Sequence, residues 1–170
     1  IRSALGELAL TPERLTAVLI THDHADHISG LPMLAKYYQV PVFASVDTGR
    51  RLINKIPQLR PFLRMFEPET GFELNDSYIT AFKTPHDAAG SVGYKIETCA
   101  GRSLGFATDL GYVPKRVLEI LSGLDLVVLE ANHDVKMLKN GTYPYFLKER
   151  ILGDYGHLSN ECSADAALEL

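Results

Sequence analysis

Short apolar runs alternate with helical periodicities along the first third of the chain. The run "TAVLI" at residues 16–20 is apolar and largely β-branched, which predicts a buried strand. Residues 28–38 carry apolar side chains at helical spacing, and Pro32 then belongs in the first turn of that helix, where proline is tolerated. Residues 40–45 predict the next strand, and residues 46–56 predict a helix.

The middle of the chain is rich in strand patterns, and the tail is mostly helical. The predicted middle strands cover residues 71–87, 91–99 and 103–109, separated by turn residues. An amphipathic helix is predicted at 113–124, a buried strand at 125–131 and a helical tail from Asp134 onward. No internal repeat or linker divides the sequence. We therefore expect one sheet-centred α/β domain over residues 1–170, with helices packed outside the sheet.

The composition limits which cellular environments and which binding partners suit this domain. The chain has 170 residues, of which 46% are hydrophobic, enough to build a core. Its net charge of −4 gives no global basic field for nucleic acid or an anionic membrane, although a local patch can still bind. Cys99 and Cys162 lie far apart and outside ligand spacing, so we expect a reducing cytoplasm. No apolar run approaches the roughly 20 residues of a membrane span, and no membrane partner is expected.

The stretch "VLITHDHADHISGL" holds half of the six histidines, directly behind a predicted buried strand. His22 and His24 are two positions apart, so on extended chain their side chains point the same way. Asp26 and His27 fall where strand gives way to helix, a place that favours a carboxylate. A solvated loop is the alternative. Imidazoles and carboxylates without thiolates suit zinc, manganese or iron, so the loop predicts a metal site.

This loop and two later stretches carry a resemblance to a known family. "THDHADH" matches the HxHxDH motif of the metallo-β-lactamase-fold hydrolases, whose fold is an αββα sandwich. "TPHDAAGSVGY" resembles the third-motif histidine of that family, and "FATDLG" resembles its bridging aspartate. "LEANHDVKML" and "YPYFLKERILGDYGHLSNE" are most similar to the exonuclease-like branch of YycJ and WalJ proteins. The resemblance covers nearly the full chain and implies two divalent metal ions, Zn²⁺ or Mn²⁺.

The family pattern assigns a ligand to each motif position. By resemblance, the first ion is held by His22, His24 and His86, the second by Asp26 and His27, and Asp109 bridges them. The residues support this in part, because His86 ends an alternating run and Asp109 follows a predicted strand. The alternatives are an ordinary surface histidine at 86 and a cap for the next segment at 109.

The sequence departs from the family at both ends. The family completes its second metal site with a late histidine, and it places further strands before the helix near Leu5. Neither is found in this sequence, which ends at Leu170 in a predicted helix. We therefore expect these 170 residues to be the central part of a longer protein, with the second site one protein ligand short.

The remaining histidines resemble the tRNA 3′-processing branch of the same family. In that branch a Glu and His pair follows the corresponding strand, and a Gly-His pair lies downstream. By this resemblance His157 donates a proton to the leaving group, Glu130 or His133 orients it, and Asp26 belongs to the catalytic set. The alternative is that both histidines hydrogen-bond the backbone of the tail, because general-acid work needs geometry that sequence does not give.

Substrate class depends on further features. Asp109 in place of a cysteine disfavours the lactam-cleaving enzymes, and His24 in place of a glutamate disfavours the di-iron branch. Between residues 48 and 66 the chain has cations and no acid: Arg50, Arg51, Lys55, Arg60 and Arg64. Arg50 and Arg51 are the candidate phosphate contacts, and a solvated helix face is the alternative.

These observations predict a metal-dependent hydrolase. The leading hypothesis is a phosphodiesterase or exonuclease that acts on DNA or RNA through a hydroxide held by two metal ions. The alternatives are a glyoxalase-II-like thioester hydrolase with the same ions, and a metal-binding protein without turnover. The sequence gives no indication of the oligomeric state.

Overall fold

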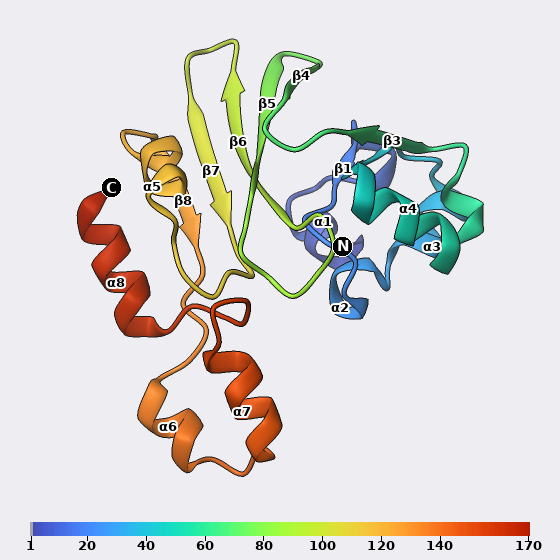
Figure 1. Cartoon of the computed structure of the whole chain (residues 1–170). Helices are drawn as coiled ribbons and strands as arrows, with labels where there is room; N and C mark the ends of the chain where they lie inside the picture. The colour runs from blue at the N-terminus through green and yellow to red at the C-terminus, as the bar shows by residue number, and fades with distance from the viewer. Residues whose placement is uncertain (1) are drawn as a thin grey trace. The chain divides into compact units, whose positions relative to one another are not determined.

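The computed structural model describes residues 2–170, and the chain divides into two compact units (Figure 1). The first unit runs to Pro68 and includes Ala88–Gly90, and the second unit comprises Glu69–Asp87 and Ser91–Leu170. We describe each unit by itself. Within residues 2–170 no helix is both long and apolar enough to cross a bilayer.

The first unit is a small parallel sheet with helices. Its elements in chain order are α1 (Arg2–Glu7), η1 (Pro12–Arg14), β1 (Val18–Leu19), α2 (Ala25–Ile28), α3 (Leu31–Tyr37), β2 (Val42–Ser45), α4 (Val46–Lys55), η2 (Pro57–Leu59) and β3 (Leu63–Phe66). The strand order is β1-β2-β3, with all pairs parallel. Parallel strands need crossover connections, and α3 and α4 belong to these connections.

The core of the first unit forms between the helices and the sheet. Leu31 and Leu34 of α3, Val42 of β2 and Leu52 of α4 belong to one buried apolar cluster. The side chain of Ser45 caps α4 by accepting a hydrogen bond from the Thr48 backbone N–H at 3.3 Å. The apolar spacing of α3 and α4 thus produces the packing that the sequence pattern predicts.

Three details of the first unit differ from the sequence prediction. The strand predicted at 16–20 is confirmed but spans only Val18–Leu19. The helix predicted at 28–38 begins at Leu31, with Pro32 in its first turn, and the four-residue α2 precedes it. Strand β3 was not predicted, because its central residues are exposed and "LRMF" shows no clear alternation.

The second unit is built on a five-stranded sheet. Its elements are β4 (Gly71–Leu74), β5 (Ser77–Lys83), β6 (Val92–Thr98), β7 (Ser103–Ala107), α5 (Lys115–Leu121), β8 (Leu126–Leu129), α6 (Val135–Asn140), α7 (Tyr145–Leu152) and α8 (Asn160–Glu169). The strand order follows the chain, antiparallel from β4 to β7 and parallel between β7 and β8. The strands and helices predicted for this part of the chain are thereby confirmed.

The direction of these strands determines where the polar residues gather. Strands β5 and β7 are both antiparallel to β6, and β8 is parallel to β7, so β5, β7 and β8 run the same way. Their carboxyl ends therefore lie at one end of the sheet. His86 follows β5, Asp109 follows β7 and Glu130 follows β8.

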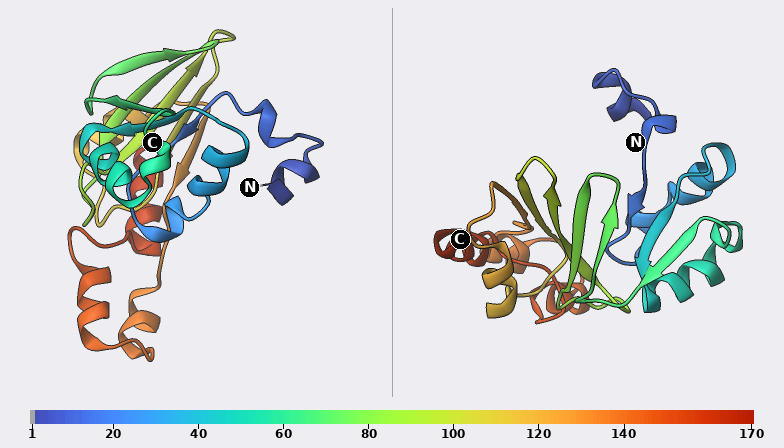
Figure 2. Two further views of the ribbon diagram at one scale, coloured as in Figure 1. Left: turned by 90° about the vertical axis from the view of Figure 1, so that its right-hand side faces the viewer. Right: turned by 90° about the horizontal axis from the view of Figure 1, so that it is seen from above.

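Helices complete the second unit. Val117 and Leu121 of α5 pack with Phe82 and Ala107 of the sheet in a buried apolar cluster, and Leu170 packs against it. Helices α6 and α7 form a hairpin beyond the carboxyl ends of β7 and β8, as Figure 1 and the left view of Figure 2 show. The fold is α/β, as predicted from the sequence.

Candidate active site

The loop after β1 brings three imidazoles together within the first unit. His24 lies directly before α2 with extended backbone, and His27 lies inside that helix. The ring centroid of His22 is 4.6 Å from that of His24 and 4.2 Å from that of His27. Asp26 is exposed, with a carboxylate oxygen 3.4 Å from Nε2 of His27. Four predicted ligands therefore share one short loop, as the sequence predicted.

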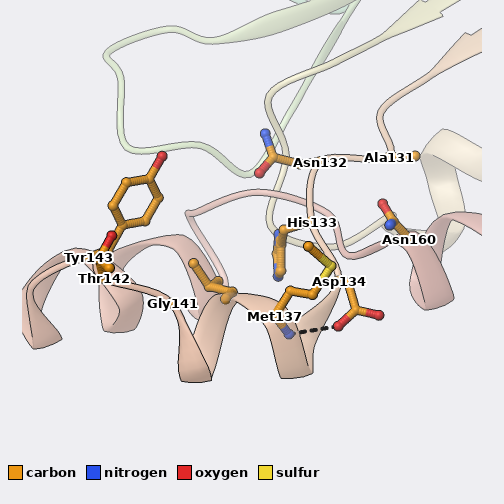
Figure 3. Close-up of a pocket in the computed structure, with 10 residues that line it drawn as sticks. Ala131, Asn132, His133, Asp134, Met137, Gly141, Thr142, Tyr143 and Asn160 are labelled. Carbon is orange, nitrogen blue, oxygen red and sulfur yellow. Dashed lines mark hydrogen bonds between the residues drawn. The ribbon is translucent and has the colours of Figure 1, made fainter.

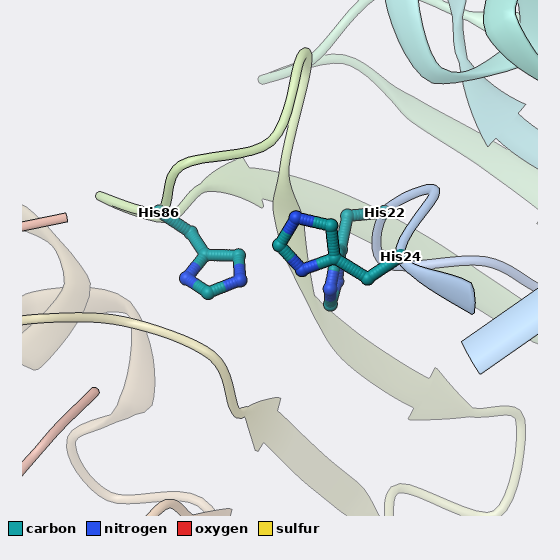
Figure 4. A group of neighbouring side chains, drawn as sticks. All are labelled: His22, His24 and His86. Carbon is teal, nitrogen blue, oxygen red and sulfur yellow. The ribbon is translucent and has the colours of Figure 1, made fainter. Parts of the chain in front are cut away.

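Interactions behind this loop fix its conformation. Oγ1 of Thr21 lies 3.1 Å from Nδ1 of His22, and the His22 side chain is fully buried. Figure 4 shows His22 and His24 leaving the same loop as neighbours; it also draws His86, which belongs to the second unit.

A buried ion pair beneath the loop was missed by the sequence analysis. Lys55, at the end of α4, donates from Nζ to the Asp23 carboxylate at 2.6 Å and to the Asp23 carbonyl at 2.7 Å. The Asp23 side chain is 2% exposed and the Lys55 side chain is 49% exposed, so a half-exposed cation stabilises a buried carboxylate. The signal in the sequence was an aspartate at a variable position of the HxHxDH motif.

The same ion pair changes the interpretation of the basic segment. Arg51 lies 3.9 Å from the Asp23 carboxylate, and Arg50 lies 3.5 Å from Asp47 on its own helix. Both guanidinium groups remain more than half exposed. Arg50 and Arg51 thus stay candidate phosphate contacts, whereas Lys55 contacts the loop that carries the histidines.

In the second unit, His86 is held by a backbone carbonyl. Nδ1 of His86 lies 3.0 Å from the Gly156 carbonyl oxygen, which accepts its hydrogen, so Nε2 is the ring atom suited to bind a metal ion. Burial lowers the pKa of His86, although the hydrogen bond to Gly156 opposes this shift. A neutral imidazole is the form that binds metals.

His86, Asp109 and His157 converge at the carboxyl end of the sheet. One potential ligand atom from each lies within 4.8 Å of the others. Asp109 has a positive φ of 58°, an uncommon backbone conformation for a residue other than glycine, directly after β7. The predicted placement of His86 and Asp109 at strand ends is confirmed by the structure. Their role as ligands stays a prediction.

Glu130 joins three segments around His157. Its Oε2 accepts hydrogen bonds from the backbone N–H groups of Leu110 at 3.0 Å and Leu158 at 3.2 Å. Its Oε1 lies 2.7 Å from Nδ1 of His157. This hydrogen bond raises the pKa of His157, against the opposite effect of burial. Glu130 thus favours a protonated His157.

His133 does not share this arrangement. The sequence analysis allowed either Glu130 or His133 to orient His157, but neither ring nitrogen of His133 has a hydrogen-bond partner among the described residues. Burial lowers the pKa of His133. Its backbone carbonyl instead accepts from the Asn160 N–H at 2.9 Å, which links the loop after β8 to the first residue of α8. Glu130, rather than His133, accepts the hydrogen bond from Nδ1 of His157.

The loop of residues 153–158 is the main feature that sequence reasoning missed. It supplies the carbonyl of Gly156 to His86, and the Tyr155 carbonyl accepts from the Asp87 N–H at 3.0 Å. A Cβ at Gly156 would collide with the Ile151 carbonyl, so only glycine fits there. Gly153 and Gly156 in the sequence are typical of a break between helices but do not indicate the contact with His86.

The donor set fits zinc or manganese. The clusters found within residues 2–170 offer imidazole nitrogens and carboxylate oxygens, and they include neither cysteine. Thr21 and Gly156 each lie beside Nδ1 of a candidate ligand, the kind of support that metal-binding histidines require. The donor set therefore fits a divalent metal ion, and the choice of metal stays a prediction.

Comparison with known proteins gives close relatives over most of the chain. The family described as "Beta-lactamase superfamily domain" matches this chain over residues 3–170. Exodeoxyribonuclease YycJ of Bacillus anthracis is 39% identical over 159 residues, covering 92% of this chain and 58% of that protein. Exodeoxyribonuclease WalJ of Streptococcus pneumoniae serotype 2 is 38% identical over 173 residues, covering 99% of this chain and 63% of that protein. The chain thus spans less than two thirds of both relatives.

A solved structure agrees on the fold. The crystal structure of the metallo-beta-lactamase fold protein YhfI from Bacillus subtilis matches with a TM-score of 0.68. The match covers 98% of this chain and 64% of that chain at 18% identity. The fold predicted from the resemblance is therefore confirmed.

Proposed function

The chain belongs to the beta-lactamase superfamily, and we propose that its protein is a metal-dependent phosphodiesterase that acts as an exonuclease on DNA. The names of the two exodeoxyribonuclease relatives support DNA as the substrate. The single observation that carries the proposal is the Glu130–His157 pair beside Asp109 and His86, at the end of the sheet where three strands finish.

Six residues would hold the metal ions. His22, His24 and His86 are proposed for the first ion and Asp26 and His27 for the second, with Asp109 between them. When bound, two divalent cations would lower the pKa of a water molecule and neutralise charge on the phosphate. We propose Zn²⁺ or Mn²⁺, the ions implied by the family resemblance, and both accept imidazole and carboxylate ligands.

His157 would protonate the leaving oxygen of the phosphodiester. Nδ1 of His157 points to Glu130, which leaves Nε2 to carry the proton that is transferred. Because Glu130 raises the pKa of His157, the imidazolium persists to a higher pH than an ordinary histidine would allow. Glu130 itself is fixed by two backbone N–H groups, and its role is to position His157.

The test measures the activity of the full-length natural protein on two classes of substrate. After chelation, Zn²⁺ or Mn²⁺ is restored, and cleavage of 5′-phosphorylated duplex DNA is compared with hydrolysis of a glutathione thioester. We expect DNA cleavage that requires the metal ion and negligible thioester hydrolysis. Preference for the thioester would overturn the nuclease proposal, and bound metal without turnover of either substrate would overturn a catalytic role.

We also propose a reducing, cytoplasmic setting. Cys99 and Cys162 are both free and exposed, which supports an environment that keeps thiols reduced.

A further inference from the structure

The hairpin of α6 and α7 encloses two hollows in the second unit. One hollow, of about 560 Å³, lies between the loop of residues 131–134, the hairpin and Asn160. The other, of about 350 Å³, is lined by residues of α7 together with His157. Asn132 and Tyr143 line both hollows, so the two are neighbours. Substrate space thus extends from the proposed proton donor along the hairpin.

Exposed aromatic rings gather on this hairpin. Tyr143 is 55% exposed, Tyr145 is 76% exposed and Phe146 is 73% exposed. Figure 3 shows the Tyr143 ring standing at one side of the larger hollow, with His133 toward its middle. Three large exposed aromatics within four residues are unusual on a surface that only faces water. Such rings offer flat faces on which unpaired bases stack.

Positive charge accompanies these rings. Residues 135–152 include Lys136, Lys139, Lys148 and Arg150, and the only acid among them is Glu149. Lys148 donates to the Lys139 carbonyl at 2.7 Å, and no carboxylate of the described chain forms an ion pair with these three lysines. Arg150 pairs with Asp87 and lines the hollow that contains His157. In a chain of net charge −4, residues 135–152 are a locally cationic segment.

Polar groups inside the larger hollow are suited to base edges. Both ring nitrogens of His133 are buried without a hydrogen-bond partner among residues 2–170, and Asn132 and Asn160 supply amides. Burial without partners is costly for polar atoms, so a ligand with donors and acceptors would stabilise this hollow. A lipid tail would leave these nitrogens unpaired, which disfavours a membrane as the partner.

We propose that the α6–α7 hairpin and the loop of residues 131–134 bind the single-stranded end of the DNA substrate. A base stacks on Tyr143, the lysines contact the phosphates, and the strand continues past Arg150 toward His157. The inference rests on the proposed nuclease function and adds that the protein binds a single-stranded part of its DNA substrate. Base pairing would block stacking on Tyr143, so the site selects unpaired bases.

The test measures binding separately from cleavage. Full-length protein carrying Asp109→Asn is titrated into a fluorescent single-stranded oligodeoxynucleotide, and anisotropy gives the Kd. Adding Tyr143→Ala should raise the Kd about tenfold, because each stacked base contributes about 1–3 kcal/mol. Lys136→Glu with Lys139→Glu should weaken binding and flatten its dependence on salt. The matched control is Tyr37→Ala on α3, where the tyrosine is 56% exposed, and its Kd should change less than twofold.

The outcomes separate this inference from the nuclease proposal. If Tyr143→Ala binds the oligonucleotide as tightly as Tyr37→Ala does, the hairpin site is wrong, even when the wild-type protein cleaves DNA. If the wild-type protein does not cleave DNA but Tyr143→Ala still weakens binding tenfold, the nuclease proposal fails and the binding surface stands. If Tyr143→Ala loses binding to anionic lipid vesicles while its binding to the oligonucleotide is unchanged, the hairpin binds membranes and the inference is wrong.

Discussion

Glu130 shows how one side chain can serve both packing and chemistry. Its carboxylate accepts two backbone hydrogen bonds and the hydrogen bond of His157, and its side chain is only 9% exposed. Since buried carboxylates need such partners, the same contacts that stabilise the anion position the histidine. The proton donor is therefore fixed by the fold before any substrate arrives.

The pH dependence of cleavage should report this pair. The pKa of His157 is raised above 6.5, so its imidazolium is present below that pH and is lost only as the pH rises through the raised value. Glu130→Gln removes the negative charge, lowers the pKa of His157 and should move the basic limb of the pH–kcat profile to lower pH. We expect kcat at pH 8 to fall about 10²-fold. An unmoved basic limb would exclude His157 as the acid.

Asp23 and Lys55 give a prediction about stability. Lys55→Met removes the cation nearest to the buried Asp23 carboxylate and leaves only Arg51, 3.9 Å away. It should lower the free energy of unfolding by about 2 kcal/mol, measured by urea denaturation of metal-free protein. The control is Lys115→Met on α5, where the side chain is 90% exposed and the change should stay within about 0.5 kcal/mol. Equal midpoints for the two variants would show that the buried pair is not stabilising the loop.

Individual residues also show the limits of sequence reasoning. His86 and Asp109 could be placed at strand ends because an alternating or apolar run directly precedes each of them. Gly156 could not be linked to His86, because 70 residues separate the two and only tertiary packing joins them. The same holds for Asp23 and Lys55, which are 32 positions apart. Contacts between distant residues leave no local pattern.

At the scale of elements, strong periodicity led to correct predictions. Helices α4 and α5 and strands β5 to β8 lie where apolar spacing placed them. The break between α2 and α3 was missed, because Ile28 and Leu31 keep a helical spacing of three across the turn at Ser29 and Gly30. Strand β3 was missed because it contributes little buried surface and is defined by pairing with β2.

Helix α4 carries a prediction about nucleic-acid binding. Arg50 and Arg51 retain exposed guanidinium groups, although each has a nearby carboxylate. Reversing both charges with Arg50→Glu and Arg51→Glu should weaken DNA binding and lower the slope of log Kd against log salt by about two. Fluorescence anisotropy at several salt concentrations measures both quantities. Unchanged affinity and slope would leave α4 as an ordinary solvated face.

At the scale of the whole molecule, motif and composition predicted the fold and the family. The alternation of strands and helices predicted an α/β domain, and the HxHxDH stretch identified its family, which the match over residues 3–170 confirms. The expected single domain corresponds here to two compact units, each with its own sheet. The aromatic and basic residues of the α6–α7 hairpin can be read from the sequence. That Tyr143 and Arg150 line one hollow with His157 cannot be read from it.

The central claim is that the imidazoles and carboxylates at these strand ends bind the metal ions of a hydrolase. Metal content per chain, measured by mass spectrometry on full-length protein after gel filtration, tests it most directly. We predict two divalent ions in the wild-type protein and a clear loss of bound metal in His24→Ala and in Asp109→Ala, with the circular dichroism of the fold retained. Full wild-type metal content in both variants would contradict the account.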